Sequence, residues 1–238
     1  MLTPVRSEKK SEQVYEKLRD SILTGEFRAG ERLPTERRLC EILEVNRSSI
    51  REALKRLEQA KLIEVRQGSG CIVLDFKATA GFDLLNDLLV PGGQIDRLAI
   101  RSIFEFRLLM CREIARLAAL RIQKPELEHL RQVLERIEGL DTGDVEQLQL
   151  LDSQFLHTMT QASENLAFIL ILNSTRDIYM ENRRYFSIMF KEQMNMRHIY
   201  RELFQALENH DEQRSQELFV ELLEKSESVF FEQFENVT

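Results

Sequence analysis

The sequence predicts a mainly α-helical protein in two parts. Apolar residues recur three to four positions apart over most of the 238 residues, which is the period of an amphipathic helix. Residues 94–238 contain one proline, Pro125, and two glycines, Gly139 and Gly143, so little interrupts helices there. Two β-prone runs within residues 62–74 predict that the N-terminal part also carries a small hairpin.

The first helix is expected at residues 11–23. Val14, Leu18 and Ile22 mark its apolar face. Gly25 should end the helix, because glycine readily adopts the left-handed conformation that closes many helices. An extended link at residues 27–33 then leads into the second helix.

The second and third helices should be separated by a tight turn. The second begins with Thr35 as its N-cap, and a turn at residues 44–45 leads into the third at residues 46–58. Asn46 is a strong N-cap candidate, because its side-chain oxygen can accept a hydrogen bond from a backbone N–H of the first turn. The residues expected to face inward from the second helix are Leu39, Ile42 and Leu43.

The third helix has two chemically different faces. Arg47, Arg51 and Lys55 follow one another at i, i+4 spacing, with Ser48 beside them. A helix N-terminus that offers cations, a hydroxyl and unpaired N–H groups suits phosphates and base edges. A solvated face of an ordinary amphipathic helix is the alternative. The opposite, apolar stripe consists of Ile50, Ala53, Leu54 and Leu57.

A β-hairpin is expected after the third helix. Residues 62–66 and 71–74 are β-prone and are joined by Gln67-Gly68-Ser69-Gly70, which has the composition of a turn. Two helices joined by a tight turn, the second cationic at its N-terminus, form a helix-turn-helix pattern. The hairpin adds a wing to that pattern.

Helix-breaking residues, proline and glycine, become rare after a cluster at residues 91–93. The helices that follow should pack as an antiparallel bundle, because each has apolar residues at helical spacing. The fold class is therefore mainly α, with an N-terminal winged helix-turn-helix at residues 1–75, a connecting segment at residues 76–94 and a C-terminal all-α antiparallel helical bundle at residues 95–238. The later helices are expected at residues 79–89, 95–122, 126–138, 144–162, 166–187, 193–208 and 212–235.

Charge and composition limit the kinds of function that the protein can have. The net charge is −7, but residues 1–75 hold 15 Lys and Arg against 13 Asp and Glu, so only this part could favour DNA. No apolar run approaches the length of a membrane span, and residues 1–6 lack the apolar segment of a signal peptide, which predicts a cytoplasmic protein without a membrane partner. Cys40, Cys71 and Cys111 are odd in number and widely spaced, so we expect buried thiols.

Three motifs in the first third of the chain carry a family resemblance. They are Gly30-Glu31-Arg32-Leu33-Pro34-Thr35-Glu36-Arg37, then Asn46-Arg47-Ser48-Ser49-Ile50-Arg51-Glu52-Ala53-Leu54, then Gln67-Gly68-Ser69-Gly70. In this order they resemble the winged helix-turn-helix of the GntR family of bacterial transcription regulators. The resemblance implies a homodimer that binds a palindromic operator in double-stranded DNA, as a repressor or an activator. It places DNA contacts on Arg37, Asn46, Arg47, Ser48, Ser49 and Arg51 and, in the wing, on Arg66, Gln67, Gly68 and Ser69.

The C-terminal part resembles the FadR subfamily of GntR regulators, whose all-helical domain binds an effector and dimerises. Residues 152–156, 162–165 and 170–173, with Tyr179, look like the fatty-acid-responsive FadR regulators. Many members of the subfamily hold a metal with one Asp and three His. The resemblance leaves Asp152 in place and predicts neither a metal nor another cofactor, because a single carboxylate cannot hold a transition metal. The three histidine positions are taken here by Leu156, Tyr200 and Leu222.

Arg107 is the main candidate for contact with an effector. It falls on the inward stripe of the helix expected at residues 95–122, and an inward arginine is unfavourable unless an anion meets it. Three alternatives stay open: a structural ion pair with Asp152 or a neighbouring Glu, a side chain that extends out of the core to solvent, or contact with an anionic effector. The candidate effector-binding residues are Arg107, Asp152, Tyr179, Tyr185, Phe186 and Tyr200.

The replaced metal positions are apolar or aromatic, which suits a hydrocarbon chain. A long-chain acyl-CoA, and with it a role in fatty acid metabolism, is therefore the leading expectation for the effector. A small carboxylate or a sugar acid is the runner-up. An enzyme fused to a DNA-binding domain is a distant alternative, since no nucleophile with a base and no Gly-rich phosphate loop is evident in the bundle. A protein-interaction scaffold, which would not bind DNA, is a further class.

Overall fold

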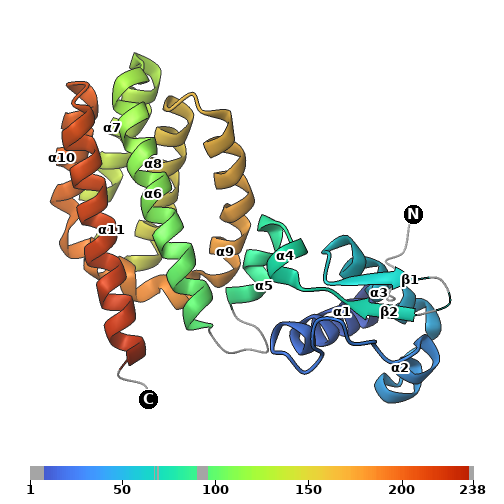
Figure 1. Ribbon diagram of the computed structural model, residues 1–238. Helices are drawn as coiled ribbons and strands as arrows, with labels where there is room; N and C mark the ends of the chain where they lie inside the picture. Colours follow the sequence, from blue (N-terminus) through green and yellow to red (C-terminus); the bar gives the residue numbers. More distant parts are fainter. Residues whose placement is uncertain (1–7, 67, 69, 90–95, 236–238) are drawn as a thin grey trace, which may run out of the picture. The chain divides into compact units, whose positions relative to one another are not determined.

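The computed structural model describes residues 8–66, 68, 70–89 and 96–235 (Figure 1). It divides into two compact units, Met1–Arg101 and Ser102–Thr238. The first unit contains a winged helix-turn-helix with a two-stranded hairpin, and the second is a helical bundle. The predicted fold class is therefore confirmed. Within the described residues, no helix combines the length and the apolar character needed to cross a bilayer.

Both predicted N-caps of the helix-turn-helix are confirmed. Thr35 Oγ1 accepts a hydrogen bond from the Arg38 N–H at 3.3 Å, and Asn46 Oδ1 accepts one from the Ser49 N–H at 2.9 Å. These side chains satisfy backbone donors that would otherwise be unpaired in the first turn. The elements of the first unit are α1 (Glu8–Leu23), α2 (Glu36–Leu43), α3 (Arg47–Gln59), β1 (Ile63–Arg66), β2 (Gly70–Val73), α4 (Phe76–Thr79), the 3-10 turn η1 (Phe82–Leu84) and α5 (Leu85–Leu89).

The core of the first unit forms between α1, α3 and the hairpin. Its fully buried members include Ile50 and Leu57 of α3, as the apolar stripe predicted. The expectation for Ile42 was wrong, because its side chain is 53% exposed. Leu43 is half-buried beside the buried Leu39. Residues four apart on a helix lie closer in angle than residues three apart, so the short α2 meets the core along the side that carries Leu39, Cys40 and Leu43 and leaves Ile42 outside.

The wing is an antiparallel hairpin in which Ile63 pairs with Val73 and Arg66 with Gly70. The extended link before α2 adds to it, since the Leu33 N–H donates to the Cys71 carbonyl at 2.9 Å. Gly70 has φ +81°, which lies in the left-handed region that favours glycine. Of the wing contacts expected from the sequence, Gln67 and Ser69 lie outside the described residues.

The single helix predicted at residues 79–89 is wrong. The structure has α4, η1 and α5 instead, because Ala80 and Gly81 adopt extended backbone angles between them. Glycine is a poor helix former, which favours a break at this point. Leu84 is 4% exposed and joins the core of the first unit. The apolar spacing therefore reflects packing of a bent segment.

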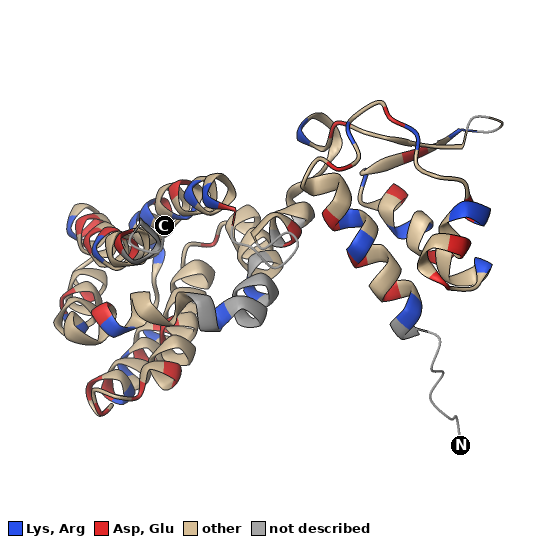
Figure 2. Ribbon diagram, turned by 90° about the horizontal axis from the view of Figure 1, so that it is seen from below, with Lys and Arg blue, Asp and Glu red and all other residues tan. Residues whose placement is uncertain are grey.

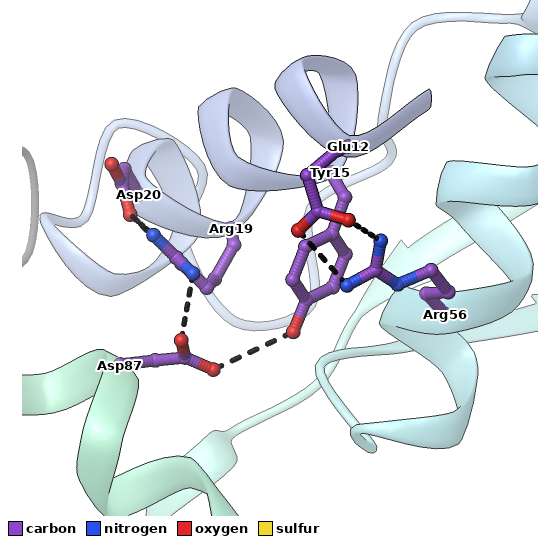
Figure 3. A network of polar contacts seen from close by, with 6 residues as sticks. All are labelled: Glu12, Tyr15, Arg19, Asp20, Arg56 and Asp87. Carbon is purple, nitrogen blue, oxygen red and sulfur yellow. Dashed lines mark hydrogen bonds and ion pairs between the residues drawn. The ribbon is translucent and has the colours of Figure 1, made fainter. Parts of the chain in front are cut away.

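A polar network joins three helices of the first unit (Figure 3). Asp87 of α5 accepts a hydrogen bond from Arg19 Nη1 of α1 at 2.7 Å and lies 3.5 Å from the Tyr15 hydroxyl. The guanidinium of Arg56, on α3, sits 4.1 Å from the centre of the Tyr15 ring and pairs with Glu12. Burial raises the pKa of Asp87, and Arg19 opposes that rise. The network thus fixes α5 to α1, and Tyr15 of α1 contacts both Asp87 of α5 and Arg56 of α3.

The second unit is built from long helices that lie alongside one another (Figure 1). Helix α8 packs against α7 and α9, α11 packs against α9 and α10, and α7 packs against α10. Helix α9 continues past residue 187, where the sequence predicted its end, because Met189, Phe190 and Met194 are buried and extend its apolar face. The helices are α6 (Arg97–Arg121), which starts in the first unit, α7 (Lys124–Glu138), α8 (Val145–Ala162), α9 (Leu166–Asn195), α10 (Arg197–Glu208) and α11 (Glu212–Glu235).

Candidate functional site

The predicted cationic end of α3 is exposed. The side chains of Arg47 and Arg51 are 76% and 70% exposed. Both face Glu36 at the start of α2, with Arg47 Nε 2.8 Å and Arg51 Nε 3.9 Å from its carboxylate oxygens. Sequence reasoning missed this carboxylate, although Glu36 stands beside the N-cap Thr35. The structure therefore brings the two arginines together around one acidic side chain.

Other expected DNA contacts differ in accessibility. Arg37 is 91% exposed and pairs with Glu41 at 3.1 Å. The Ser48 hydroxyl donates to Asn46 Oδ1 at 2.9 Å, so Asn46 holds the helix N-terminus. Ser49 is only 2% exposed, and its hydroxyl has no hydrogen-bond partner among the described residues. This burial removes the Ser49 side chain from the accessible surface of α3.

The wing places a further cation at the end of β1. Arg66 is 57% exposed and pairs with Glu64 at 2.7 Å. Figure 2 shows that acidic and basic residues alternate along the helices of the first unit. Exposed ion pairs of this kind contribute at most about 1 kcal/mol, so their cations can exchange a carboxylate for a phosphate at low cost.

The second unit encloses a cluster of polar side chains contributed by five helices. The Tyr200 hydroxyl of α10 donates to Asp152 Oδ1 of α8 at 2.7 Å, and both residues are buried. Gln193 Nε2 of α9 donates to Ser226 Oγ of α11 at 3.3 Å. Arg107 of α6 faces this region too. Two residues expected at the effector site, Asp152 and Tyr200, are thus in direct contact.

Arg107 has an acidic partner that the sequence analysis did not single out. Its Nη1 lies 3.5 Å from Glu227 Oε1, and the two side chains are 23% and 11% exposed. Burial raises the pKa of Glu227 to about 7, more than the nearby Arg107 lowers it. Burial also raises the pKa of Asp152, against the opposing effects of Arg107 and Tyr200. One guanidinium therefore faces two buried carboxyl groups.

Aromatic side chains pack at the Phe186 candidate position. Phe186 is 7% exposed, and its ring centre lies 6.2 Å from that of Phe104 and 5.9 Å from that of Phe230. The remaining effector candidates, Tyr179 and Tyr185, belong to α9, but their side chains lie outside the described part of the structure. The structure thus sets Phe186 in an apolar environment.

The donor set around Asp152 does not fit the metal site of the subfamily. Among the described residues, no group of three or more His, Cys, Asp or Glu side chains is placed to hold a metal. Asp152 is engaged by the Tyr200 hydroxyl, and Leu222 is fully buried and has no donor atom. Absence of a metal stays a prediction, which elemental analysis of the protein purified without a histidine tag would test.

A pH dependence of stability follows from the Glu227 environment. A folded-state pKa near 7, above the ordinary 4.5, means that stability is lost as the pH rises from about 4.5 through 7. We expect Glu227→Gln to remove this loss. Its melting temperature should exceed the wild-type value at pH 8 by an amount equivalent to about 3 kcal/mol, and the difference should shrink to less than about 1 kcal/mol at pH 5. Glu224→Gln, an exposed position one turn earlier, is the control. Parallel pH profiles for Glu227→Gln and the wild type would contradict the assignment.

Two family models match the chain. Residues 10–73 match the bacterial regulatory proteins of the gntR family, and residues 102–225 match the FCD domain. The second match covers the greater part of the second unit.

Relatives of known name are similar over much of the chain. The HTH-type transcriptional regulator Mce2R of Mycobacterium tuberculosis is 47% identical over 143 residues, which are 60% of this chain and 58% of that protein. The chain thus matches less than two thirds of that relative's length. The fatty acid metabolism regulator protein of Shewanella frigidimarina is 31% identical over 188 residues, or 74% of this chain and 72% of that protein.

A solved structure shares the fold. The structure of Lar, which controls expression of the Listeria monocytogenes agr system, covers 98% of this chain and 99% of its own with a TM-score of 0.59 and 16% identity. At that identity the likeness supports the architecture alone. The two family matches, together with the exposed cationic end of α3, identify the family of the chain. The chain belongs to the GntR family of bacterial regulatory proteins, and its C-terminal part is an FCD domain.

Proposed function

We propose that the protein is a transcription regulator that binds a short palindromic operator as a homodimer. The observation that carries this proposal is the exposure of Arg47 and Arg51 at the N-terminal end of α3. In a helix-turn-helix this end of the second helix contacts base edges in the major groove. One short helix reads few base pairs, so two-fold pairing doubles both the contact and the specificity. No catalytic step is part of the proposal.

The proposed contacts divide by chemistry. Arg47 and Arg51 contact base edges or phosphates, and Ser48 lies beside them. Arg37 contacts the backbone phosphates, while Asn46 holds α3 in place through its cap. We leave Ser49 out because its side chain is buried. The proposed wing contacts to the minor groove or backbone are Arg66, Gln67, Gly68 and Ser69.

Selection of bound duplexes from a random DNA pool tests this function. We expect the enriched sequences to be inverted repeats, and fluorescence anisotropy to give two protein chains per duplex with an affinity that falls steeply as salt is added. A single half-site should bind much more weakly than the full repeat. Recovery of no common sequence would reject a sequence-specific regulator and favour an interaction scaffold.

We further propose that the FCD domain binds an effector that alters operator affinity, with a long-chain acyl-CoA as the leading candidate. Phe186 and the rings around it offer an apolar lining, and Arg107 offers a cation for a polar group. The relative from Shewanella frigidimarina is named a fatty acid metabolism regulator, which supports this choice. The buried polar cluster of Asp152, Gln193 and Tyr200 favours the runner-up, a small carboxylate or sugar acid.

A thermal-shift screen separates these effectors. A ligand that binds the folded state alone raises the melting temperature, so acyl-CoAs of graded chain length should stabilise the protein more than free fatty acids or small organic acids. Stabilisation by a short hydroxy acid or a sugar acid, with none by any acyl-CoA, would replace the leading candidate with the runner-up.

We expect Asp87 to be required for the effector response. Asp87→Asn weakens the contacts that fix α5 to α1, so the connecting segment transmits less of any change to α3. Without effector, the operator affinity of Asp87→Asn should stay within about twofold of the wild-type value. The change in operator affinity that the effector causes should be at least about fivefold smaller than in the wild type, because a typical coupling between two sites changes affinity by at least this factor. Anisotropy titrations with and without effector measure both. Asp20→Asn, which removes the other carboxylate paired with Arg19, is the matched control. An unchanged response in Asp87→Asn would exclude this route.

A further inference from the structure

Two buried carboxyl groups lie within the electrostatic reach of the single guanidinium of Arg107, and one of them, Glu227, is its ion-pair partner. Glu227 Oε1 lies 3.5 Å from Arg107 Nη1, and the Arg107 charge also acts on the Asp152 carboxylate. Glu227 and Asp152 are each 8% exposed. Asp152 accepts a hydrogen bond from Tyr200, whereas Glu227 Oε1 accepts none from any described residue. Glu227 is therefore held less firmly than Asp152.

Such a carboxylate occupies the place that an incoming anion would take. Guanidinium groups bind carboxylates and phosphates through the same pair of N–H donors, so the two anions exclude each other. The Arg107 side chain is 23% exposed to solvent, so a ligand can reach it. Once displaced, Glu227 would stay buried without its cation, and a buried unpaired carboxylate is strongly unfavourable. Protonation removes that penalty.

We propose that the anionic group of the effector replaces the Glu227 carboxylate at Arg107 and that Glu227 takes up one proton from solvent when it does. The inference rests on the proposed effector function of the FCD domain. The proton converts the carboxylate into a carboxylic acid, and no other bond changes. Effector binding is thereby linked to pH, and Glu227 sets the strength of that link.

The neighbouring groups point to Glu227 as the site of proton uptake. Burial raises the pKa of the Cys111 thiol of α6 to about 12, which keeps it protonated. Asp152 of α8 keeps the hydrogen bond from Tyr200 of α10 as its own support. Glu224, on α11 itself, is exposed and raises the pKa of Glu227. Gln193 of α9 is hydrogen-bonded to Ser226, the residue before Glu227 on α11, and neither of these two side chains carries a charge at neutral pH.

Calorimetry with two probes tests the proposal. Palmitoyl-CoA and succinate are titrated into the full-length wild type, Glu227→Gln and the control Glu224→Gln, in buffers of different ionisation enthalpy between pH 6 and 8.5. For at least one probe we expect the wild type to take up close to one proton per site at pH 8, and its affinity to fall about tenfold per pH unit above 7. Glu227→Gln should take up no proton and bind at least about tenfold more tightly at pH 8. Glu224→Gln should still take up a proton and still lose affinity as the pH rises, with the profile shifted downward only by the minor effect of the Glu224 charge on Glu227. Gln has nearly the shape of the protonated Glu, so the variant should keep the fold, which circular dichroism verifies.

The outcomes separate this inference from the effector assignment. Binding of palmitoyl-CoA without proton uptake and with equal affinity for wild type and Glu227→Gln overturns the exchange and leaves the acyl-CoA assignment standing. Binding of succinate alone, with uptake abolished in Glu227→Gln, supports the exchange and rejects the acyl-CoA. If neither probe binds Glu227→Gln, in which the competing charge is gone, the proposal that Arg107 receives an anion is overturned.

Discussion

Replacing both Arg47 and Arg51 with alanine is expected to lower operator affinity about a hundredfold or more, since each direct arginine contact contributes about 1–3 kcal/mol. Both side chains are mostly exposed and lie at the N-terminal end of α3. Anisotropy titration of the selected operator at physiological salt measures the loss. Each single variant should lose less than the double variant. The salt dependence of binding should become shallower if the arginines contact phosphates.

Two controls sharpen this test. Arg131→Ala removes a half-exposed arginine of the FCD domain and should leave operator affinity unchanged. Glu36→Gln removes the carboxylate that Arg47 and Arg51 share, so it should strengthen binding severalfold. Unchanged affinity in the double variant would show that α3 does not read the operator, whatever the wing does.

The largest expected loss of stability comes from Leu57→Ala. Leu57 is fully buried between α3 and the rest of the core, and a leucine truncated at such a site typically loses about 2–5 kcal/mol through lost burial and a residual cavity. The loss should appear in the first unit. Hydrogen exchange measured by mass spectrometry should show faster exchange in α1 and α3, with the helices of the second unit little changed.

Ile42→Ala is the matched control, because Ile42 is an apolar residue that is 53% exposed on α2. We expect it to change stability by less than about 0.5 kcal/mol, as surface substitutions usually do. Equal losses for Leu57→Ala and Ile42→Ala would contradict the core described for this unit.

Local signals were readable from the sequence. The caps at Thr35 and Asn46 and the apolar stripe of α3 depend on neighbours within four residues, and each is where it was predicted. The break at Gly81 was missed because apolar spacing alone was weighed there, although the glycine itself signals it. A glycine within an apolar pattern is therefore stronger evidence for a break in the helix than continuous apolar spacing is for an unbroken helix.

Contacts between side chains that are far apart in the sequence could not be predicted in the same way. Arg107 was recognised as an inward cation that needs an anion, but the sequence could not choose between a side chain and an effector. The structure pairs it with Glu227, which lies 120 positions further on. A usable signal existed, since Glu227 follows the buried Leu223 by four positions and so falls on the inward face of α11. The pairing of Glu36 with Arg47 gave no such signal, because Arg47 is exposed, Glu36 is partly exposed, and charged residues at such positions follow no apolar pattern.

The pairing of the link before α2 with β2 has a consequence for how the first unit folds. The Leu33 N–H bonds to the Cys71 carbonyl and the Val73 N–H bonds to the Glu31 carbonyl, so strand β2 is held on both sides. These partners are roughly 40 residues apart, and such a loop closes slowly because its entropy is lost before the contacts form. The helices between them must already be compact when the ends meet. We therefore expect the docking of β2 on this link to be the last step in the assembly of the DNA-binding unit. Val73→Pro, which abolishes one of these bonds, should leave the helices formed and the wing undocked.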